Sequence, residues 1–243
     1  MSRAPLISGL RPSGGDSTAA RSLPQEAGLA LRRLALPAVL VAGATILLGL
    51  LLTRILDTTW VSREDAELSR DLAAQRDADG KAVTSLFTVL AETPTIIGLT
   101  LLAAAIFRLV FKRWRESVVV VCAVVGETLI FWLTTLLIDR RRPVVPQLDP
   151  APPTSSFPSG HTAAAVAFYG AVALIVLWHT RKVWLRWLAV AVAIAVPLAV
   201  GGSRLYRGMH FPTDVLAGLL LGATWLTMVG GRLRPHRRTD RYR

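Results

Sequence analysis

Cysteine is almost absent from the chain, and charged residues are few. The single Cys122 excludes an internal disulfide framework and any zinc site built from cysteines. Charged residues make up 18% of the 243 residues, whereas apolar residues make up 52% and the mean hydropathy is +0.47. A water-soluble domain carries about 25% charged residues, spread along the chain. The composition therefore argues against a disordered chain and against an ordinary cytosolic domain.

Acidic residues are also fewer than basic residues. The 28 lysines and arginines outnumber the 16 aspartates and glutamates, which gives a formal charge of +12. On an apolar chain, such an excess reflects membrane topology and anionic lipid surfaces more often than nucleic-acid binding. No run of basic residues interleaved with aromatic residues stands out, so we expect no nucleic-acid partner.

Long apolar runs are what the chain does have. A membrane helix needs roughly 17–25 such residues, and six stretches qualify. We expect an all-α fold, an integral membrane bundle of six transmembrane helices. The expected spans cover residues 34–56, 83–111, 117–138, 160–178, 183–200 and 212–229. The first is too long for a signal peptide and no small-residue cleavage site follows it, so we expect it to be retained.

The segments outside the spans divide the chain. Residues 1–28 are rich in Ser, Gly, Pro and Arg without apolar periodicity, which predicts a disordered cytoplasmic tail. Residues 29–231 form the expected membrane domain, and residues 232–243 a basic cytoplasmic tail. In the first outer loop, residues 61–79 favour a short charged helix, which we interpret as a solvated connector.

Lysine and arginine predict the orientation of the spans. They crowd both tails and the connections at residues 112–115 and 181–186, and these four segments alternate with the others. Because such clusters stay inside, we expect a multi-pass plasma-membrane protein with both termini in the cytoplasm. The outer connections nevertheless carry Arg140, Arg141, Arg142, Arg204 and Arg207. Arginines on the disfavoured side indicate an anionic ligand.

The second outer loop ends in a motif suited to an anion. Pro158-Ser159-Gly160-His161 stands directly before the fourth span. Ser159 is a suitable N-cap, and the first N–H groups of the helix have no intrahelical acceptor. These groups and the helix dipole form an anion site, which Gly160 lets an oxyanion approach closely. His161 is then expected at the rim of that site.

The third outer connection pairs a histidine with a carboxylate. His210 precedes Asp214 by four residues, and Pro212 favours a helix start between them. That spacing allows the carboxylate to reach back to one imidazole nitrogen. The bond would fix the tautomer and leave the other nitrogen as a nucleophile.

With these residues the chain resembles the type 2 phosphatidic-acid phosphatases, lipid phosphate phosphatases that share a site with vanadium haloperoxidases. The family motifs are Lys-x6-Arg-Pro, Pro-Ser-Gly-His and Ser-Arg-x5-His-x3-Asp. The second is complete at residues 158–161, and the third at Ser203, Arg204, His210 and Asp214. The first is partial, because Arg142-Pro143 match but Thr135 occupies the lysine position. The resemblance covers residues 117–229.

The resemblance implies a role for each matched residue. His210 attacks phosphorus to form a phosphohistidine, Asp214 orients His210, and His161 protonates the leaving alkoxide and then activates water. The non-bridging oxygens are held by four phosphate-binding residues, namely Arg142, Ser159, Gly160 and Arg204. Neither a metal nor another cofactor is implied. Thr135 brings no positive charge, and Arg140 or Arg141 is the candidate to replace it.

We therefore expect a membrane phosphatase with its active site at the outer membrane–water interface. The substrate would be a lipid phosphate or diphosphate entering sideways from the outer leaflet, either a phosphatidic-acid type or a polyprenyl diphosphate. The alternatives are an anion transporter or channel that uses the same arginines, and a vanadate-binding haloperoxidase. Glu92 and Glu127 lie inside expected spans, where we favour interhelical hydrogen bonding or arginine orientation over a direct substrate role. The oligomeric state stays open.

Overall fold

The described part of the chain is all-helical. The computed structural model describes residues 21–151 and 153–234. Its elements are α1 (Leu23–Leu50), continued by the π-helical segment η1 (Leu51–Ile55), then α2 (Trp60–Ala74), α3 (Ala78–Val89), α4 (Thr93–Phe111), α5 (Arg115–Leu137), α6 (Gly160–His179), α7 (Val183–Tyr206) and α8 (Pro212–Leu233). Because α1 begins at Leu23, the expectation of disorder is wrong for residues 23–28. Residues 1–20 and 235–243 of the two expected tails lie outside the described residues.

In the described part of the chain, six helices are long and apolar enough to cross a membrane. They are α1 with η1, α4, α5, α6, α7 and α8. The all-α integral membrane architecture with six candidate spans is therefore confirmed.

The second expected span is shorter than its apolar run. Residues 83–89 belong to α3, and a new helix starts at Thr93 with Glu92 at its N-cap and Pro94 in its first turn. Proline lacks the backbone N–H that a continuing helix needs, but it fits the first turn of a new one. The expectation of one continuous helix from residue 83 is therefore wrong.

The fifth span is longer than expected. Helix α7 continues to Tyr206, so Ser203 and Arg204 lie on its last turns rather than in a connection. Gly201 and Gly202 favour a helix end, but the helix continues through both of them. The chain leaves the helix at Gly208, whose φ of +72° lies in the left-handed region open to glycine.

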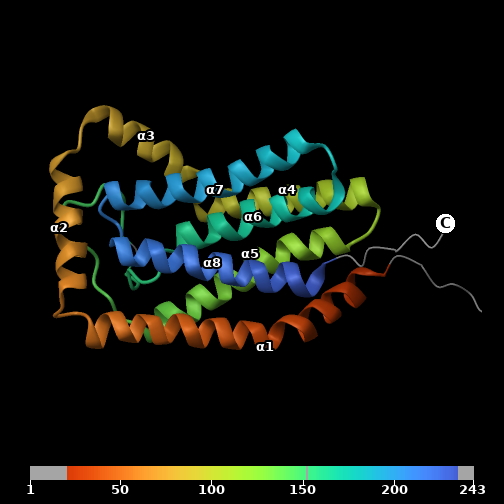
Figure 1. Cartoon of the computed structure of the whole chain (residues 1–243), viewed down its shortest axis with the longest axis horizontal. Coiled ribbons are helices and arrows are strands. Elements are labelled where there is room, and N and C mark those ends of the chain that lie inside the picture. Colours follow the sequence, from red (N-terminus) through yellow and green to blue (C-terminus); the bar gives the residue numbers. More distant parts are fainter. Residues whose placement is uncertain (1–20, 152, 235–243) are drawn as a thin grey trace, which may run out of the picture.

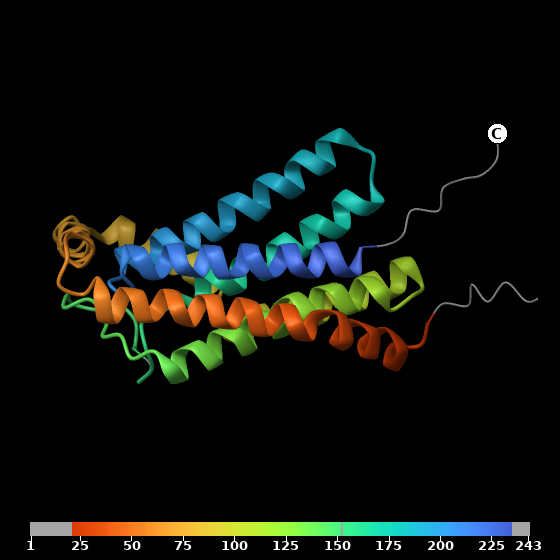
Figure 2. The same ribbon diagram turned by 60° about the horizontal axis from the view of Figure 1, so that its bottom comes forward.

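Helix α6 lies at the centre of the bundle. It packs against α7, α8, α5 and α4, and small residues let these helices approach closely. The buried ones on α6 include Ala163, Ala165, Ala167, Gly170 and Ala171. Figure 2 shows α1 and α8 running side by side, and α7 diverging from α8 toward the end where the described chain begins and finishes.

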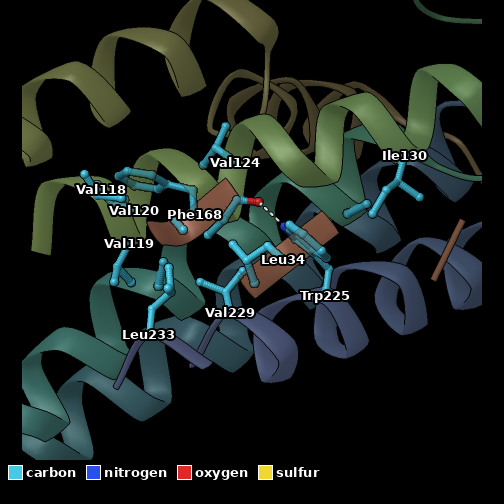
Figure 3. Close-up of a cluster of buried hydrophobic side chains, with 14 of the residues drawn as sticks. Leu34, Val118, Val119, Val120, Val124, Ile130, Phe168, Trp225, Val229 and Leu233 are labelled. Atoms are coloured by element: carbon cyan, nitrogen blue, oxygen red, sulfur yellow. Dashed lines mark hydrogen bonds between the residues drawn. The ribbon is translucent and has the colours of Figure 1, made fainter. Parts of the chain in front are cut away.

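The main apolar core lies between α1, α5, α6 and α8 (Figure 3). Its largest buried side chain is Trp225, whose indole N–H donates to the carbonyl of Ala123 on α5 at 3.0 Å. The facing residue on α5 is Gly126, and a Cβ there would overlap the indole ring. The contact between α5 and α8 therefore depends on a glycine opposite a tryptophan.

Apolar side chains also cover the outside of the bundle. Leu36 and Leu47 on α1, Leu101 on α4, Leu136 on α5 and Trp187 on α7 are each more than half exposed. In a membrane protein these faces contact hydrocarbon, so they carry no desolvation cost. Helix α2, by contrast, lies across one end of the bundle (Figure 1), beside the α5–α6 and α7–α8 connections.

Substituting Gly126 tests the core contact. Alanine usually stabilises a helix relative to glycine by about 1 kcal/mol, but a methyl group at residue 126 would press on the rigid, buried indole of Trp225. We expect Gly126→Ala to destabilise the protein by roughly 1–3 kcal/mol, measured by thermal unfolding in detergent. The control is Gly98→Ala on α4, where nothing lies within 4 Å of the added Cβ. A Gly126→Ala variant as stable as Gly98→Ala would contradict this packing.

Candidate functional site

The connections at the α2 end of the bundle are joined by backbone hydrogen bonds. Leu148 N–H donates to the Arg207 carbonyl at 3.1 Å, and Ser159 N–H donates to the Asp214 carbonyl at 3.0 Å. Arg142 Nη1 donates to the Met209 carbonyl at 2.7 Å. These bonds hold the α5–α6 and α7–α8 connections against each other, so motifs far apart in the sequence meet.

A cavity of about 390 Å³ opens beside these connections. Five of the seven expected site residues line it, namely Arg142, Gly160, His161, Arg204 and His210. Thr135 lines it as well, and the remaining wall comes mainly from α4 and α5. Ile97 and Trp132 belong to that wall and are also 54% and 53% exposed on the outside of the bundle. The cavity therefore extends from the polar connections toward the lipid-facing surface between α4 and α5.

His210 is held by a backbone carbonyl. Its imidazole is 5% exposed, and Nδ1 lies 2.7 Å from the carbonyl oxygen of Ser156, which can only accept. Nδ1 therefore carries the proton, and Nε2 keeps its lone pair. Burial, and then the positive charges of Arg204 and Arg142, hold the pKa of the His210 imidazole well below its usual range. The ring is thus neutral near pH 7, as a nucleophile must be.

Asp214 does not make the hydrogen bond to His210 that the spacing suggested. The nearest pair, Asp214 Oδ2 and His210 Nδ1, is 3.9 Å apart, too long for a hydrogen bond. Asp214 Oδ2 instead accepts from the Phe211 N–H at 2.9 Å, and Oδ1 accepts from Arg140 Nη1. The carboxylate is satisfied by the first turn of its own helix and by Arg140, and it acts on His210 only through its charge.

Arg140 connects Asp214 to α2. Its Nη2 donates to Asp65 Oδ2 at 2.8 Å, and Asp65 also accepts from the Thr213 N–H at 3.1 Å. Asp65 is 3% exposed on α2, whereas Leu68 of the same helix is 44% exposed. The helix is therefore docked on the site by a carboxylate, and the expectation of a merely solvated connector is wrong. The sequence offered no local signal for this pair, because 75 residues separate its members.

Arg142 and Arg204 each present an unsatisfied donor. In both, the buried Nε has no hydrogen-bond partner among the described residues. Arg204 Nη1 donates to Asp149 Oδ2 at 2.7 Å, and Asp149 also takes hydrogen bonds from Arg207. Burial alone would raise the pKa of the Asp149 carboxyl, but the bonds from Arg207 and the charge of Arg204 hold it below its usual value. Two guanidinium groups, each with a buried and unpaired Nε, suit a phosphate.

The start of α6 provides backbone donors. Gly160 is its first residue, and a Cβ there would lie 2.8 Å from the ring of Phe131, so the close approach of α5 requires glycine. Ser159 precedes it as the N-cap, but its hydroxyl lies 2.9 Å from that of Thr162. Ser159 is fully buried and is not part of the cavity wall. The Ser159 hydroxyl is thus not brought to the cavity, whereas Gly160 and the partly buried His161 are.

Thr135, which occupies the lysine position of the first family motif, faces the cavity. Thr135 lies on the last turns of α5, and its hydroxyl donates to the Trp132 carbonyl at 2.9 Å. Of the two candidates to replace the charge, Arg140 is committed to Asp65 and Asp214, and Arg141 is exposed. Neither side chain belongs to the cavity wall.

Glu92 and Glu127, the two glutamates within the expected spans, differ in location and burial. Glu92 occupies the N-cap position of α4 without a side-chain capping hydrogen bond and is partly buried, whereas Glu127 is 1% exposed and lines the cavity. Within residues 21–151 and 153–234, neither makes an ion pair with an arginine, and the one side-chain contact of Glu127 is to Thr128 on its own helix. The expected interhelical hydrogen bonding or arginine orientation is therefore wrong for both. In the same ranges no three His, Cys, Asp or Glu residues are grouped to hold a metal ion. Whether the reaction is metal-independent stays a prediction.

Comparison with known proteins places these residues in a family context. Residues 118–231 match the model of the PAP2 superfamily. The chain is 34% identical over 127 residues to an undecaprenyl-diphosphatase of Sulfolobus acidocaldarius, covering 50% of this chain and 57% of the relative. It is 38% identical over 87 residues to phosphatidylglycerophosphatase B of Escherichia coli, covering 33% of this chain and 32% of the relative. These matches thus span little more than half of a curated relative at most.

One solved structure is similar over most of the chain. It is a transmembrane PAP2-type phosphatidylglycerolphosphate phosphatase from Bacillus subtilis, with a TM-score of 0.71 and 25% sequence identity. The match covers 83% of this chain and 98% of that chain. The likeness therefore includes the arrangement of the spans as well as the motif region.

The docking of α2 gives a testable prediction. Asp65→Asn keeps the shape of the side chain but leaves the buried Arg140 with one carboxylate instead of two. We expect a loss on the order of 2 kcal/mol, because the charge-assisted hydrogen bonds that Asp65 accepts from Arg140 and Thr213 are buried and would be weakened or lost. The measurement is thermal unfolding in detergent, with Asp71→Asn on the exposed side of α2 as the control. Equal unfolding temperatures for the two variants would show that Asp65 does not anchor the helix.

Proposed function

The chain belongs to the PAP2 superfamily through residues 118–231, and from that premise we propose that it is an integral membrane phosphatase acting on the phosphate or diphosphate of a lipid. One observation carries the proposal. His210 donates its Nδ1 proton to the Ser156 carbonyl, so Nε2 is free in a cavity that also holds His161, Arg142 and Arg204. A neutral imidazole in the same cavity as two guanidinium groups suits nucleophilic attack on phosphorus.

In the first step, Nε2 of His210 forms a bond to phosphorus and the bond from phosphorus to the lipid oxygen breaks. His161 supplies the proton that the leaving oxygen needs. Arg142, Arg204 and the Gly160 N–H hold the non-bridging oxygens, where the transition-state charge is concentrated. The free Nε groups of both arginines support this role.

In the second step, water attacks the phosphohistidine and its proton passes to His161. The phosphorus–nitrogen bond breaks, which restores neutral His210 and releases phosphate. Between the steps the imidazole carries positive charge, and the Asp214 carboxylate 3.9 Å from Nδ1 stabilises it without a direct hydrogen bond. The Ser156 carbonyl keeps the ring oriented throughout. The Ser159 hydroxyl bonds Thr162, so Ser159 contributes through its backbone N–H, which holds the Asp214 carbonyl.

The cavity supports a lipid substrate. Its wall continues from the arginines to apolar residues of α4 and α5 that are exposed on the outside of the bundle. A lipid can therefore place its phosphate against the connections while its chain stays in the bilayer. Relatives with the names undecaprenyl-diphosphatase, phosphatidylglycerophosphatase B and lipid A 1-phosphatase support this substrate class.

The orientation is part of the proposal. Both ends of the described chain lie at the end of the bundle opposite α2 (Figure 1). The excess of lysine and arginine there and in the tails supports a cytoplasmic location for both termini. The site would then face the periplasm or exterior and take its lipid from the outer leaflet.

The proposed nucleophile can be tested directly. We expect His210→Ala to abolish phosphate release from a panel of lipid phosphates, assayed in detergent with a strong chelator present. Wild-type protein quenched during turnover should carry an acid-labile phosphate on residue 210, detected by mass spectrometry. His179→Gln at the opposite end of the bundle serves as the control. Phosphate release by a folded His210→Ala variant, or release that requires added magnesium, would contradict the mechanism.

Thr135 gives a second test. Lysine at this position of the cavity wall places an ammonium near the non-bridging oxygens, and a partly desolvated charge pair contributes about 1 kcal/mol or more. We expect Thr135→Lys to lower the inhibition constant of vanadate, which mimics the transferring phosphoryl group. Turnover need not rise, because tighter ground-state binding leaves the maximal rate unchanged. Thr135→Val controls for shape, and an unchanged constant in the folded lysine variant would place residue 135 away from the phosphate.

A further inference from the structure

Glu127 is a buried acid in the cavity that the proposed reaction does not use. It lies in the middle of α5, is 1% exposed and belongs to the same cavity wall as His161, Arg204 and His210. Its Oε1 has no hydrogen-bond partner within the described ranges, and its Oε2 has only a long contact of 3.4 Å with the Thr128 hydroxyl. A residue of the cavity wall thus carries a buried carboxyl oxygen that is unsatisfied.

The position of Glu127 sets its depth below the phosphate. The ring of Phe131 packs on Gly160, whose N–H belongs to the proposed phosphate site. Glu127 precedes Phe131 by four residues, which is roughly 6 Å along the helix axis and away from the connections. The cavity wall there is otherwise largely apolar, with Ile96, Val124 and Ala164. Glu127 is therefore a polar group in the part of the cavity that would hold the lipid.

The depth of Glu127 below the proposed phosphate site matches the position of the glycerol oxygens in a glycerolipid phosphate. In a glycerolipid phosphate, the hydroxyl or ester oxygens of the glycerol lie roughly 5–7 Å from phosphorus at ordinary bond lengths. A hydroxyl pairs with the carboxyl in either protonation state, and an ester carbonyl pairs with its acid form. In a polyprenyl or simple alkyl phosphate, hydrocarbon occupies the same depth and Oε1 stays unpaired.

Resting on the lipid phosphatase function proposed above, we propose that Glu127 is a specificity-determining residue that hydrogen-bonds an oxygen of the lipid's glycerol backbone. A site built to hydrogen-bond a substrate group rejects analogues that lack it, because its own polar atom is left buried and unpaired. The cavity therefore favours a glycerolipid phosphate over a lipid whose hydrocarbon begins next to the phosphate.

The test compares two substrates that differ in the backbone oxygens. Dioleoyl phosphatidic acid carries them and hexadecyl phosphate does not, and kcat/KM is measured for both in the same detergent. We expect Glu127→Leu to lower the ratio of the two values about tenfold, the effect of one hydrogen bond left unmade. Glu127→Gln should keep the ratio within about threefold of wild type, since an amide also donates and accepts. Glu92→Leu, outside the cavity wall, should leave the ratio unchanged.

The outcomes separate this inference from the proposed function. If wild-type protein hydrolyses neither substrate, the lipid phosphatase function is wrong. If it hydrolyses both and Glu127→Leu leaves the ratio unchanged, or Glu127→Gln lowers it as much as leucine does, the role of Glu127 is wrong. Thermal unfolding reports whether each variant is folded, and Glu127→Met supplies a flexible apolar replacement if the leucine variant is not.

Discussion

The buried ion network of Asp65, Arg140 and Asp214 is the interaction on which the site depends. Arg140 is 11% exposed between two carboxylates, one on α2 and one at the start of α8. The backbone carbonyl of Arg140 accepts a hydrogen bond from the Ser156 N–H. The carbonyl of Ser156 in turn accepts a hydrogen bond from His210 Nδ1. A guanidinium group buried this deeply must be paired. Its pairing aligns α2, the α5–α6 connection and the proposed nucleophile together.

Charge pairing also separates two kinds of arginine near the cavity. Arg140 and Arg207 donate to carboxylates, and these ion pairs stabilise the folded connections. Arg142 and Arg204 line the cavity and each keeps a buried Nε without a partner in the described part of the chain, although Arg204 also pairs with Asp149. Free donors held by a rigid surrounding are what electrostatic stabilisation of a phosphoryl group requires. The excess of arginine at this end therefore divides into scaffold and proposed phosphate site.

The bilayer explains why one part of the cavity wall is polar and another part is apolar. The part of the cavity beside the α5–α6 and α7–α8 connections is rich in polar and charged groups. The part farther from these connections is formed by the apolar faces of α4 and α5. A lipid phosphate has the same division, with charge at one end and hydrocarbon at the other. Glu127 interrupts the apolar part at one depth, and this makes the cavity more selective than an apolar slot.

Local patterns in the sequence were enough for the spans and for the motifs. Hydropathy depends on neighbouring residues only, so six spans could be predicted, and Pro94 and Gly208 show why two boundaries differed. The fixed spacing of Pro158 to His161 and of Ser203 to Asp214 identified the family. Tertiary structure alone decided the partners of the charged groups. Asp65 and Asp149 pair with arginines 75 and 55 residues away, and the Ser156 carbonyl holds His210 across 54 residues. No local pattern specifies such pairs, because they form only when the connections have folded against one another and buried charges must find whichever partners lie within reach.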